Sequence, residues 1–262
     1  MTSAGENKPL FDLRGRVVII TGGAVGIGRI YSEQLSAAGM RVVIADIAAD
    51  AGEKLAAKLR EQGSEALSVA TDISNEKATQ NLAAAVIERF GRIDALINNA
   101  SLMSSLPRRS WLEIPAGEWD RVMAVDLRGL FLCCRAVAPQ MKKQGKGKIV
   151  NITSTRVFEG TPNRLHYTTA KAGVIGFTRA LAREVGPDNI AVNVVAPGLT
   201  LSETQLATSQ SSYLASGYDQ QRAFARAQYP EDLVGTVMFL LSDASDFMTG
   251  QTLVVDGGKF MH

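Results

Sequence analysis

The chain has 262 residues, of which 46% are hydrophobic and 21% charged, and its formal net charge is +2. This composition is typical of a globular protein with a substantial core, and it includes no basic run of the kind that binds nucleic acid. Residues 1–13 lack an apolar stretch of signal-peptide length and no later segment resembles a membrane span, so we expect a cytoplasmic protein without a membrane partner.

Short apolar, β-branched runs alternate with helix-forming segments along the chain. The predicted strands are 16–21, 41–45, 66–70, 95–97, 148–152, 191–195 and 252–255. The predicted helices run from the glycines after the first strand to Ala38, and over 51–62, 75–90 with Ser74 as its N-cap, 117–143, 165–181 and 230–241. Continuously apolar strands that alternate with helices predict a single doubly wound, Rossmann-type α/β domain over residues 1–262, with a seven-stranded parallel sheet flanked by helices. The segment 199–228, rich in Ser, Gln and Ala, interrupts the alternation and is predicted to form a substrate lid.

Gly22, Gly26 and Gly28 lie between the first strand and the following helix. Glycines in this position let a pyrophosphate approach the backbone and the free N–H groups at the helix N-terminus, although a tight turn without a ligand is the alternative. Asp46 ends the second strand, where a carboxylate binds the ribose diol of an adenosine and repels a 2′-phosphate. No Arg or Lys lies between Thr21 and Gly28 or just after Asp46 to receive such a phosphate, so the pattern favours NAD over NADP. A solvated strand-end charge is the alternative for Asp46.

Tyr167 and Lys171 are four residues apart in a predicted helix, so their side chains should project from one face. A free tyrosine has a pKa of about 10, and a cation at 4–5 Å supplies on the order of the 4 kcal/mol needed to bring it near 7. This pair is therefore a candidate acid–base centre. An ordinary half-buried pair is the alternative for an isolated motif of this kind.

In this order and spacing, the motifs resemble those of the short-chain dehydrogenase/reductase family over essentially the whole chain. The segment 21–28 resembles its cofactor turn, 98–100 resembles its strand-four motif, and Ser154 precedes Tyr167 by the thirteen residues expected of its catalytic serine. The resemblance implies a cofactor site formed by Gly22, Val25, Gly26, Ile27, Gly28, Asp46, Asp72, Ile73, Asn99, Ala100, Tyr167, Lys171, Pro197, Gly198 and Thr200. Asn193 would belong to the segment that seats the nicotinamide.

The same resemblance implies an NAD(H)-dependent oxidoreductase that interconverts a secondary alcohol and a ketone, in this case an aromatic or alicyclic small molecule. Tyr167 would be the general acid or base, Lys171 would lower its pKa, and Ser154 would stabilise charge on the substrate oxygen. Substrate-binding residues would include Thr155, Arg156 and Thr161 in a mostly apolar pocket with Arg156 as the nearest charge. No metal is expected, because His166 and His262 form no ligand cluster. The alternative function is a catalytically silent NAD-binding sensor or scaffold.

Two residues depart from the family pattern. Ser101 stands where the family has glycine, and Asp126 stands where it has an asparagine that serves the proton relay. We keep Asp126 among the catalytic residues. If it is charged it should raise the pKa of Tyr167, whereas burial among apolar neighbours would leave it neutral.

The predicted helices over 125–134 and 172–177 are apolar nearly all round, so a second surface should cover them besides the sheet. The resemblance implies a homotetramer, and coverage by loops of the same chain is the alternative. Cys133 and Cys134 lie in the first of these segments, should pack as small hydrophobic residues, and suit a reducing compartment.

Overall fold

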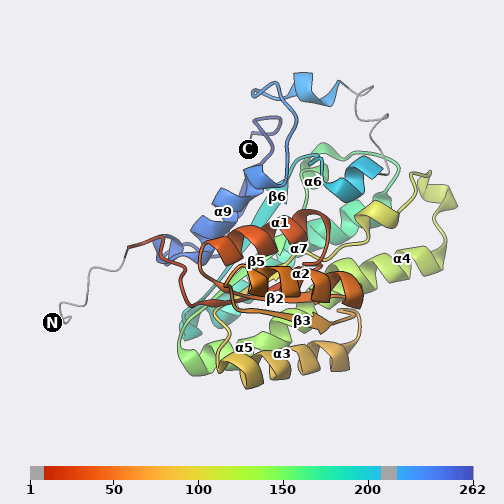
Figure 1. Cartoon of the computed structure of the whole chain (residues 1–262). Helices are drawn as coiled ribbons and strands as arrows, with labels where there is room; N and C mark the ends of the chain where they lie inside the picture. The colour runs from red at the N-terminus through yellow and green to blue at the C-terminus, as the bar shows by residue number, and fades with distance from the viewer. Residues whose placement is uncertain (1–8, 208–216, 262) are drawn as a thin grey trace.

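The computed structural model describes residues 9–207 and 217–261, and one parallel sheet runs through its centre (Figure 1). The strands lie in the order β3-β2-β1-β4-β5-β6-β7 and every neighbouring pair is parallel. Their bounds are β1 Val17–Thr21, β2 Arg41–Asp46, β3 Ala66–Ala70, β4 Ala95–Asn98, β5 Gly147–Ile152, β6 Ile190–Pro197 and β7 Thr252–Val255. The seven predicted strands and the doubly wound, Rossmann-type architecture are thus confirmed.

Helices cover both faces of the sheet because the central strands bury both of their faces. In β1, Val18 and Ile20 pack with α1, α2 and α9, while Val17 and Ile19 pack with α3, α5 and α7. Figure 1 shows α1, α2 and α9 together on one side, with α3 and α5 on the other. The bounds are α1 Gly26–Ala37, α2 Ala49–Glu61, α3 Glu76–Phe90, α4 Ala116–Met123, α5 Leu130–Gln144, α6 Arg156–Glu159, α7 Leu165–Val185 and α9 Glu231–Leu241. None of the described helices is both long and apolar enough to span a membrane.

Two helix predictions need correction. Helix α3 begins one residue later than predicted, and its N-cap is Asn75, whose side chain accepts the N–H of Ala78, rather than Ser74. The predicted helix 117–143 consists of three pieces, because a π-helical turn, η3 (Ala124–Gly129), separates α4 from α5. Such wide turns are frequent at functional sites, and this one contains Asp126.

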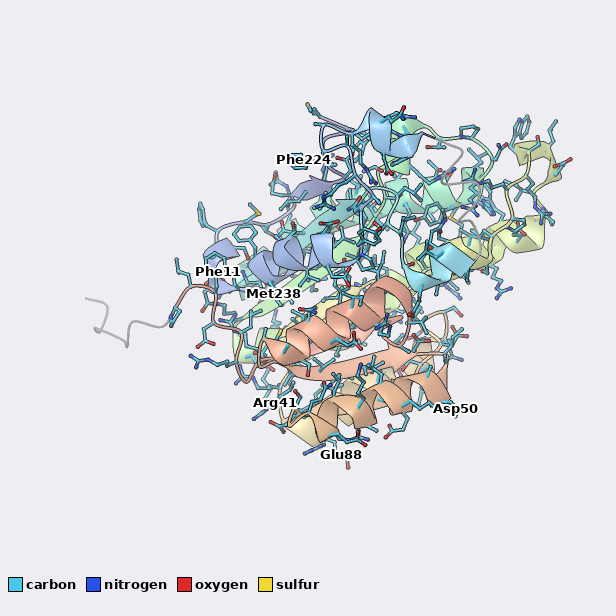
Figure 2. The ribbon with its side chains drawn as sticks, turned by 45° about the horizontal axis from the view of Figure 1, so that its top comes forward. Phe11, Arg41, Asp50, Glu88, Phe224 and Met238 are labelled. Carbon is cyan, nitrogen blue, oxygen red and sulfur yellow. The ribbon has the colours of Figure 1, made fainter. Side chains whose placement is uncertain are left out.

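The strand order reverses between β1 and β4, which are neighbours although α1, β2, α2, β3 and α3 separate them in the chain. The loops that leave these two strands therefore diverge and open a crevice at their carboxyl ends. The predicted lid, 199–228, lies partly outside the described residues, which omit 208–216. Its second part includes the short helix η5 (Tyr218–Gln221). Figure 2 shows Asp50 and Glu88 on the outer side of the helices that cover the sheet, and both residues are exposed.

Candidate active site

A cavity of about 780 Å³ occupies the crevice at the carboxyl ends of β1, β4, β5 and β6. Its size is that of a cofactor or substrate site. It is lined by Gly22, Val25, Gly26, Ile27, Asp46, Asp72, Ile73, Asn99, Ala100, Ser154, Thr155, Arg156, Thr161, Tyr167, Lys171, Pro197, Gly198 and Thr200. Every predicted site residue is therefore part of this lining except Gly28, Asp126 and Asn193.

The backbone of the glycine turn has a conformation that lets a ligand approach it closely. Gly22 and Gly26 have φ of 62° and 59°, a region that residues with a Cβ rarely adopt. Gly28 lies behind the cavity wall, where a Cβ atom would stand 1.9 Å from the carbonyl oxygen of Gly22. Gly28 is thus required for packing helix α1 against the turn rather than for contact with a ligand. Asn99 fixes the turn from the end of β4, since its side-chain amide donates to the carbonyls of Thr21 and Gly22 at 3.1 Å each.

An anionic group already lies at the N-terminus of α1. The Glu203 carboxylate accepts the Gly26 N–H at 3.0 Å and pairs with Arg29 at 2.8 Å. Hydrogen bonding from Arg29, ahead of that from Gly26, lowers the pKa of Glu203. Its carboxylate oxygen occupies the kind of position that a phosphate oxygen would take, because helix N-termini attract anions through free N–H groups and the helix dipole. The turn and its donors therefore fit a pyrophosphate, and the residues present fit a dinucleotide cofactor.

Asp46 is a buried part of the turn rather than a solvated strand-end charge. Its side chain is 8% exposed and accepts the N–H groups of Ala24 and Ala48 at 3.0 Å each. Further along this wall, Asp72 accepts both the N–H and the hydroxyl of Ser74, at 2.9 and 2.7 Å. The two carboxylates stand at the ends of β2 and β3, where a ribose and an adenine would lie if the cofactor followed the glycine turn.

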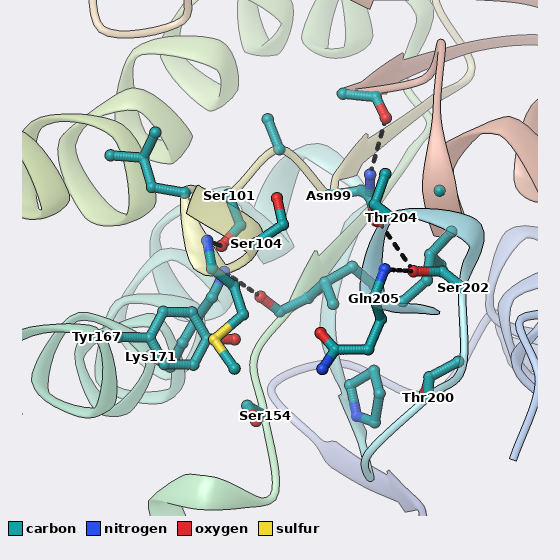
Figure 3. A pocket seen from close by; sticks show the side chains of 18 of the residues that line it. Asn99, Ser101, Ser104, Ser154, Tyr167, Lys171, Thr200, Ser202, Thr204 and Gln205 are labelled. Carbon is teal, nitrogen blue, oxygen red and sulfur yellow. Dashed lines mark hydrogen bonds between the residues drawn. The ribbon is translucent and has the colours of Figure 1, made fainter. Parts of the chain in front are cut away.

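Tyr167, Lys171 and Ser154 lie together on the opposite side of the cavity from Thr200 and Ser202 (Figure 3). Tyr167 and Lys171 come from successive turns of α7, and the Lys171 ammonium is 5.7 Å from the centre of the Tyr167 ring. The ammonium donates to the Ile152 carbonyl at 3.1 Å, which fixes it at the end of β5. A hydroxyl, a phenol and a lysine thus converge on one wall, as the sequence predicts.

The two departures from the family pattern contact one another. The Asp126 carboxylate, 2% exposed, lies behind the cavity wall with one oxygen 3.2 Å from the Lys171 ammonium. The same oxygen accepts the Ser101 hydroxyl, and the other accepts the Leu102 N–H at 3.1 Å. An amine cation, a hydroxyl and a backbone N–H thus all contact this buried carboxylate.

Opposing effects act on the pKa of Tyr167. Burial raises it, and the Lys171 charge lowers it. The Asp126 charge raises it, whereas a hydrogen bond with Ser154 and the Arg156 charge lower it. In total the pKa lies above its ordinary value in the structure. Asp126 therefore opposes Lys171 in setting the acidity of the phenol.

The substrate end of the cavity is more cationic than the sequence predicts. Besides Arg156, the cavity lining includes Arg108, Arg121 and Lys259, so further positive charges accompany Arg156 there. Lys259 pairs with Glu159 at 3.1 Å, and the Tyr218 hydroxyl donates to the same carboxylate oxygen at 3.1 Å. Arg108 and Arg121 come from the loop after β4 and from α4, and no motif in the sequence points to them.

Two other polar residues have structural roles. His166 is fully buried and outside the cavity lining, with its Nε2 atom 3.2 Å from Glu118 of α4. His166 therefore packs against α4 and does not line the cavity. Asn193 also lies outside the lining, and its side chain joins β6 to Met248 and Gln251 just before β7.

Comparisons with known proteins agree with this geometry. Residues 22–259 match the protein family described as enoyl-(acyl carrier protein) reductase. A probable galactose dehydrogenase of Rhizobium meliloti is 37% identical over 250 residues, which cover 95% of this chain and 96% of that protein. A 3-oxoacyl-[acyl-carrier-protein] reductase of Synechocystis is 38% identical over 256 residues, 95% of this chain and 98% of that protein. The crystal structure of a putative gluconate dehydrogenase from Agrobacterium tumefaciens superposes with a TM-score of 0.90 at 32% identity, over 96% of this chain and 98% of that one. The chain therefore belongs to the short-chain dehydrogenase/reductase family, whose members are oxidoreductases that use NAD or NADP and act on small molecules.

Proposed function

We propose that this chain interconverts a secondary alcohol and a ketone on an aromatic or alicyclic framework, with NAD(H) as cofactor and Tyr167 as acid–base. The observation that carries the proposal is the meeting of Ser154, Tyr167 and Lys171 on one wall of a cavity whose other end is a glycine turn. These three groups favour an enzyme over a silent NAD-binding sensor or scaffold. The test is oxidation of a panel of aromatic and alicyclic secondary alcohols with NAD, followed by the absorbance of the reduced cofactor.

Each residue has a defined task in this reaction. The Tyr167 phenol exchanges a proton with the substrate oxygen, and the Ser154 hydroxyl donates to that oxygen while its charge changes. Lys171 is fixed by the Ile152 carbonyl and by Asp126, so its charge acts on the phenol from a constant position. The nicotinamide, when bound, supplies the hydride chemistry. The glycine turn, Asp46 and Asp72 would hold the remainder of the dinucleotide.

The choice of NAD depends on Asp46. We expect NAD to be preferred over NADP by about tenfold or more, because a 2′-phosphate would meet this buried carboxylate. Asp46→Ala should narrow that preference. It should also lower the free energy of unfolding by about 1–3 kcal/mol, since the Ala24 and Ala48 N–H groups lose their acceptor.

The measurement is kcat/KM with each cofactor, together with urea unfolding of the same proteins. Asp50→Asn is the matched control, because Asp50 is an exposed acid in the first turn of α2 and should change neither quantity much. Equal efficiency of the wild-type protein with both cofactors would contradict the assignment of NAD.

We also propose that a second copy of the chain covers the face formed by α5 and α7, within a homotetramer. Phe131 of α5 is 40% exposed and packs edge-to-face on Phe177 of α7, with ring centroids 6.4 Å apart. Sedimentation velocity should show an oligomer for the wild-type protein and smaller species for Phe131→Glu, because a charge there opposes apolar contact. Ile87→Glu on α3 is the control, and a monomeric wild-type protein would contradict the proposal.

We propose that the protein is located in the cytoplasm. Cys133 and Cys134 support it, since both are buried free thiols whose pKa values are raised by burial. Such thiols persist most easily in a reducing environment.

A further inference from the structure

Three arginines that line the cavity make no ion pair with a carboxylate of the described residues. Arg108, Arg121 and Arg156 all line it, and within residues 9–207 and 217–261 no carboxylate lies within ion-pair distance of any of them. The segment 208–216, which the structure does not describe, contains no Asp or Glu in its sequence. Arg29, beside the glycine turn, is by contrast paired with Glu203.

Arg156 is held in place by backbone groups rather than by an acid. Its Nη2 atom donates to the carbonyls of Thr161 and Pro162 at 3.0 and 2.9 Å. Its Nε atom is buried without a hydrogen-bond partner, and its backbone N–H donates to the Ser154 hydroxyl at 3.3 Å. Arg156 is thus a preorganised cation two residues from the catalytic serine, with part of its hydrogen-bonding capacity unused.

The positive charges lie close enough to affect one another. Burial first, then the Arg156 and Arg108 charges, lower the pKa of Arg164 to about 10. Burial also lowers the pKa of Arg156, and the Arg108 charge adds to this effect, while the charges of Tyr167, Glu159 and Tyr218 oppose it. Like charges in a concave site raise the energy of the free protein, and an anion bound between them relieves that repulsion.

The acids that line the cavity do not balance this charge. Asp46 and Asp72 belong to the glycine-turn end, where they bind the backbone and Ser74. Glu159 is the acid at the substrate end, and it is already bound by Lys259, by the Tyr218 hydroxyl and by the Thr161 hydroxyl. The three arginines therefore remain available for an anion that enters with the substrate.

We propose that the substrate is a secondary alcohol or ketone that carries a carboxylate, which Arg156 binds together with Arg108 while the carbinol lies against Ser154 and Tyr167. This inference rests on the proposed function and names its substrate class. An arginine fork matches the two oxygens of a carboxylate, and Arg121 adds a further positive charge to the same lining. Leu102 and Met103 of the same lining supply apolar contact for the framework between the two groups.

The experiment compares acids with their methyl esters, so that size and framework stay nearly constant while the charge is removed. Suitable pairs are 4-(1-hydroxyethyl)benzoate and 3-hydroxycyclohexanecarboxylate, each with its methyl ester, and the quantity measured is kcat/KM with NAD. We expect the acids to be preferred by about tenfold or more, mainly through KM, since charge-assisted hydrogen bonds are the strong ones. An ester that is equal to its acid, or better, overturns the inference.

Variants assign the effect to the arginines. Arg108→Gln and Arg156→Met should each reduce the acid-to-ester ratio by about tenfold. The ratio is the proper quantity because the Arg156 charge also lowers the pKa of Tyr167, so its loss should slow both substrates. Arg89→Gln removes the same charge from the exposed side of α3 and should leave the ratio unchanged. A ratio that stays constant in both cavity variants overturns the inference.

A binding measurement separates failure of this inference from failure of the proposed function. Calorimetry follows 4-acetylbenzoate and its methyl ester binding to the protein saturated with NADH. Turnover of the esters with no gain from the carboxylate overturns the inference and leaves the alcohol–ketone function standing. Tighter binding of the acid that Arg108→Gln weakens, without turnover of any pair, supports the anion site and contradicts the proposed reaction. Neither turnover nor arginine-dependent binding overturns both.

Discussion

The Tyr167→Phe variant should lose nearly all turnover, by a factor of about 10²–10⁴, while it still binds NAD. The substitution keeps the aromatic ring, which packs with Leu106, Val122 and Ala170, and deletes only the hydroxyl that exchanges the proton. Because this packing is retained, we expect no fold defect. The measurements are kcat with the best alcohol of the panel, Kd for NAD by calorimetry, and thermal unfolding.

Tyr31→Phe provides the matched control. Tyr31 is fully buried in helix α1, burial raises the pKa of its hydroxyl, and that hydroxyl has no hydrogen-bond partner in the structure. Removal of this hydroxyl should therefore leave turnover unchanged and should not destabilise the protein. Retention of more than about a tenth of the wild-type kcat in Tyr167→Phe would show that another group is the principal acid–base.

Replacement of Asp126 by asparagine should keep the enzyme active and change its pH dependence. Alcohol oxidation needs the deprotonated phenol, so kcat/KM rises with pH through the pKa of Tyr167. The Asp126 charge raises that pKa, and Asp126→Asn removes the charge while it retains an oxygen acceptor for the Ser101 hydroxyl. The rising limb of the profile should therefore move to lower pH. For ketone reduction, which needs the protonated phenol, the falling limb should move to lower pH as well.

Two further variants serve as comparisons for Asp126→Asn. Asp126→Ala leaves the buried Lys171 ammonium without its carboxylate and should cost about 3–5 kcal/mol of folding free energy. Asp120→Asn removes an exposed charge from α4 and should leave the profile in place. An unchanged profile in Asp126→Asn would mean that this carboxylate does not act on the phenol. An inactive Asn variant would assign the carboxylate a catalytic duty of its own.

The structural features that could be predicted from the sequence are those set by residues close together in the chain. Runs such as Val17–Thr21 form strands because continuous β-branched residues suit a sheet that is buried on both faces. The glycine turn is predictable because positive φ at Gly22 and Gly26 excludes other residues. Tyr167 and Lys171 are predictable as a pair because helical spacing alone places them on one face.

Features that depend on contacts between distant segments escaped prediction. The π-helical turn contains no Pro that would predict an interruption of the helix. Glycine is needed at position 129 because a Cβ atom there would lie 2.8 Å from the side chain of Ile73, a residue distant in the sequence. The contact of Ser101 with Asp126 joins a loop after β4 to that turn, although the departure of both residues from one family pattern was a usable signal. Arg108 and Arg121 also line the cavity. No local sequence pattern predicts that the segments carrying them pass beside it.

The π-helical turn has a further consequence for how the molecule can diverge. Its hydrogen-bonded loop is one residue wider than that of an α-helix, in which each residue advances the direction of a side chain by about 100°. Loss or gain of a single residue within Ala124–Gly129 therefore rotates α4 relative to α5 by roughly that angle. Such a change would turn Arg121 and the other side chains of α4 to a different direction relative to the cavity. Helix α5 would still pack on the sheet through Cys133, Val137 and Met141. A change of one residue within this turn can therefore alter the orientation of α4 while the core packing of α5 is retained.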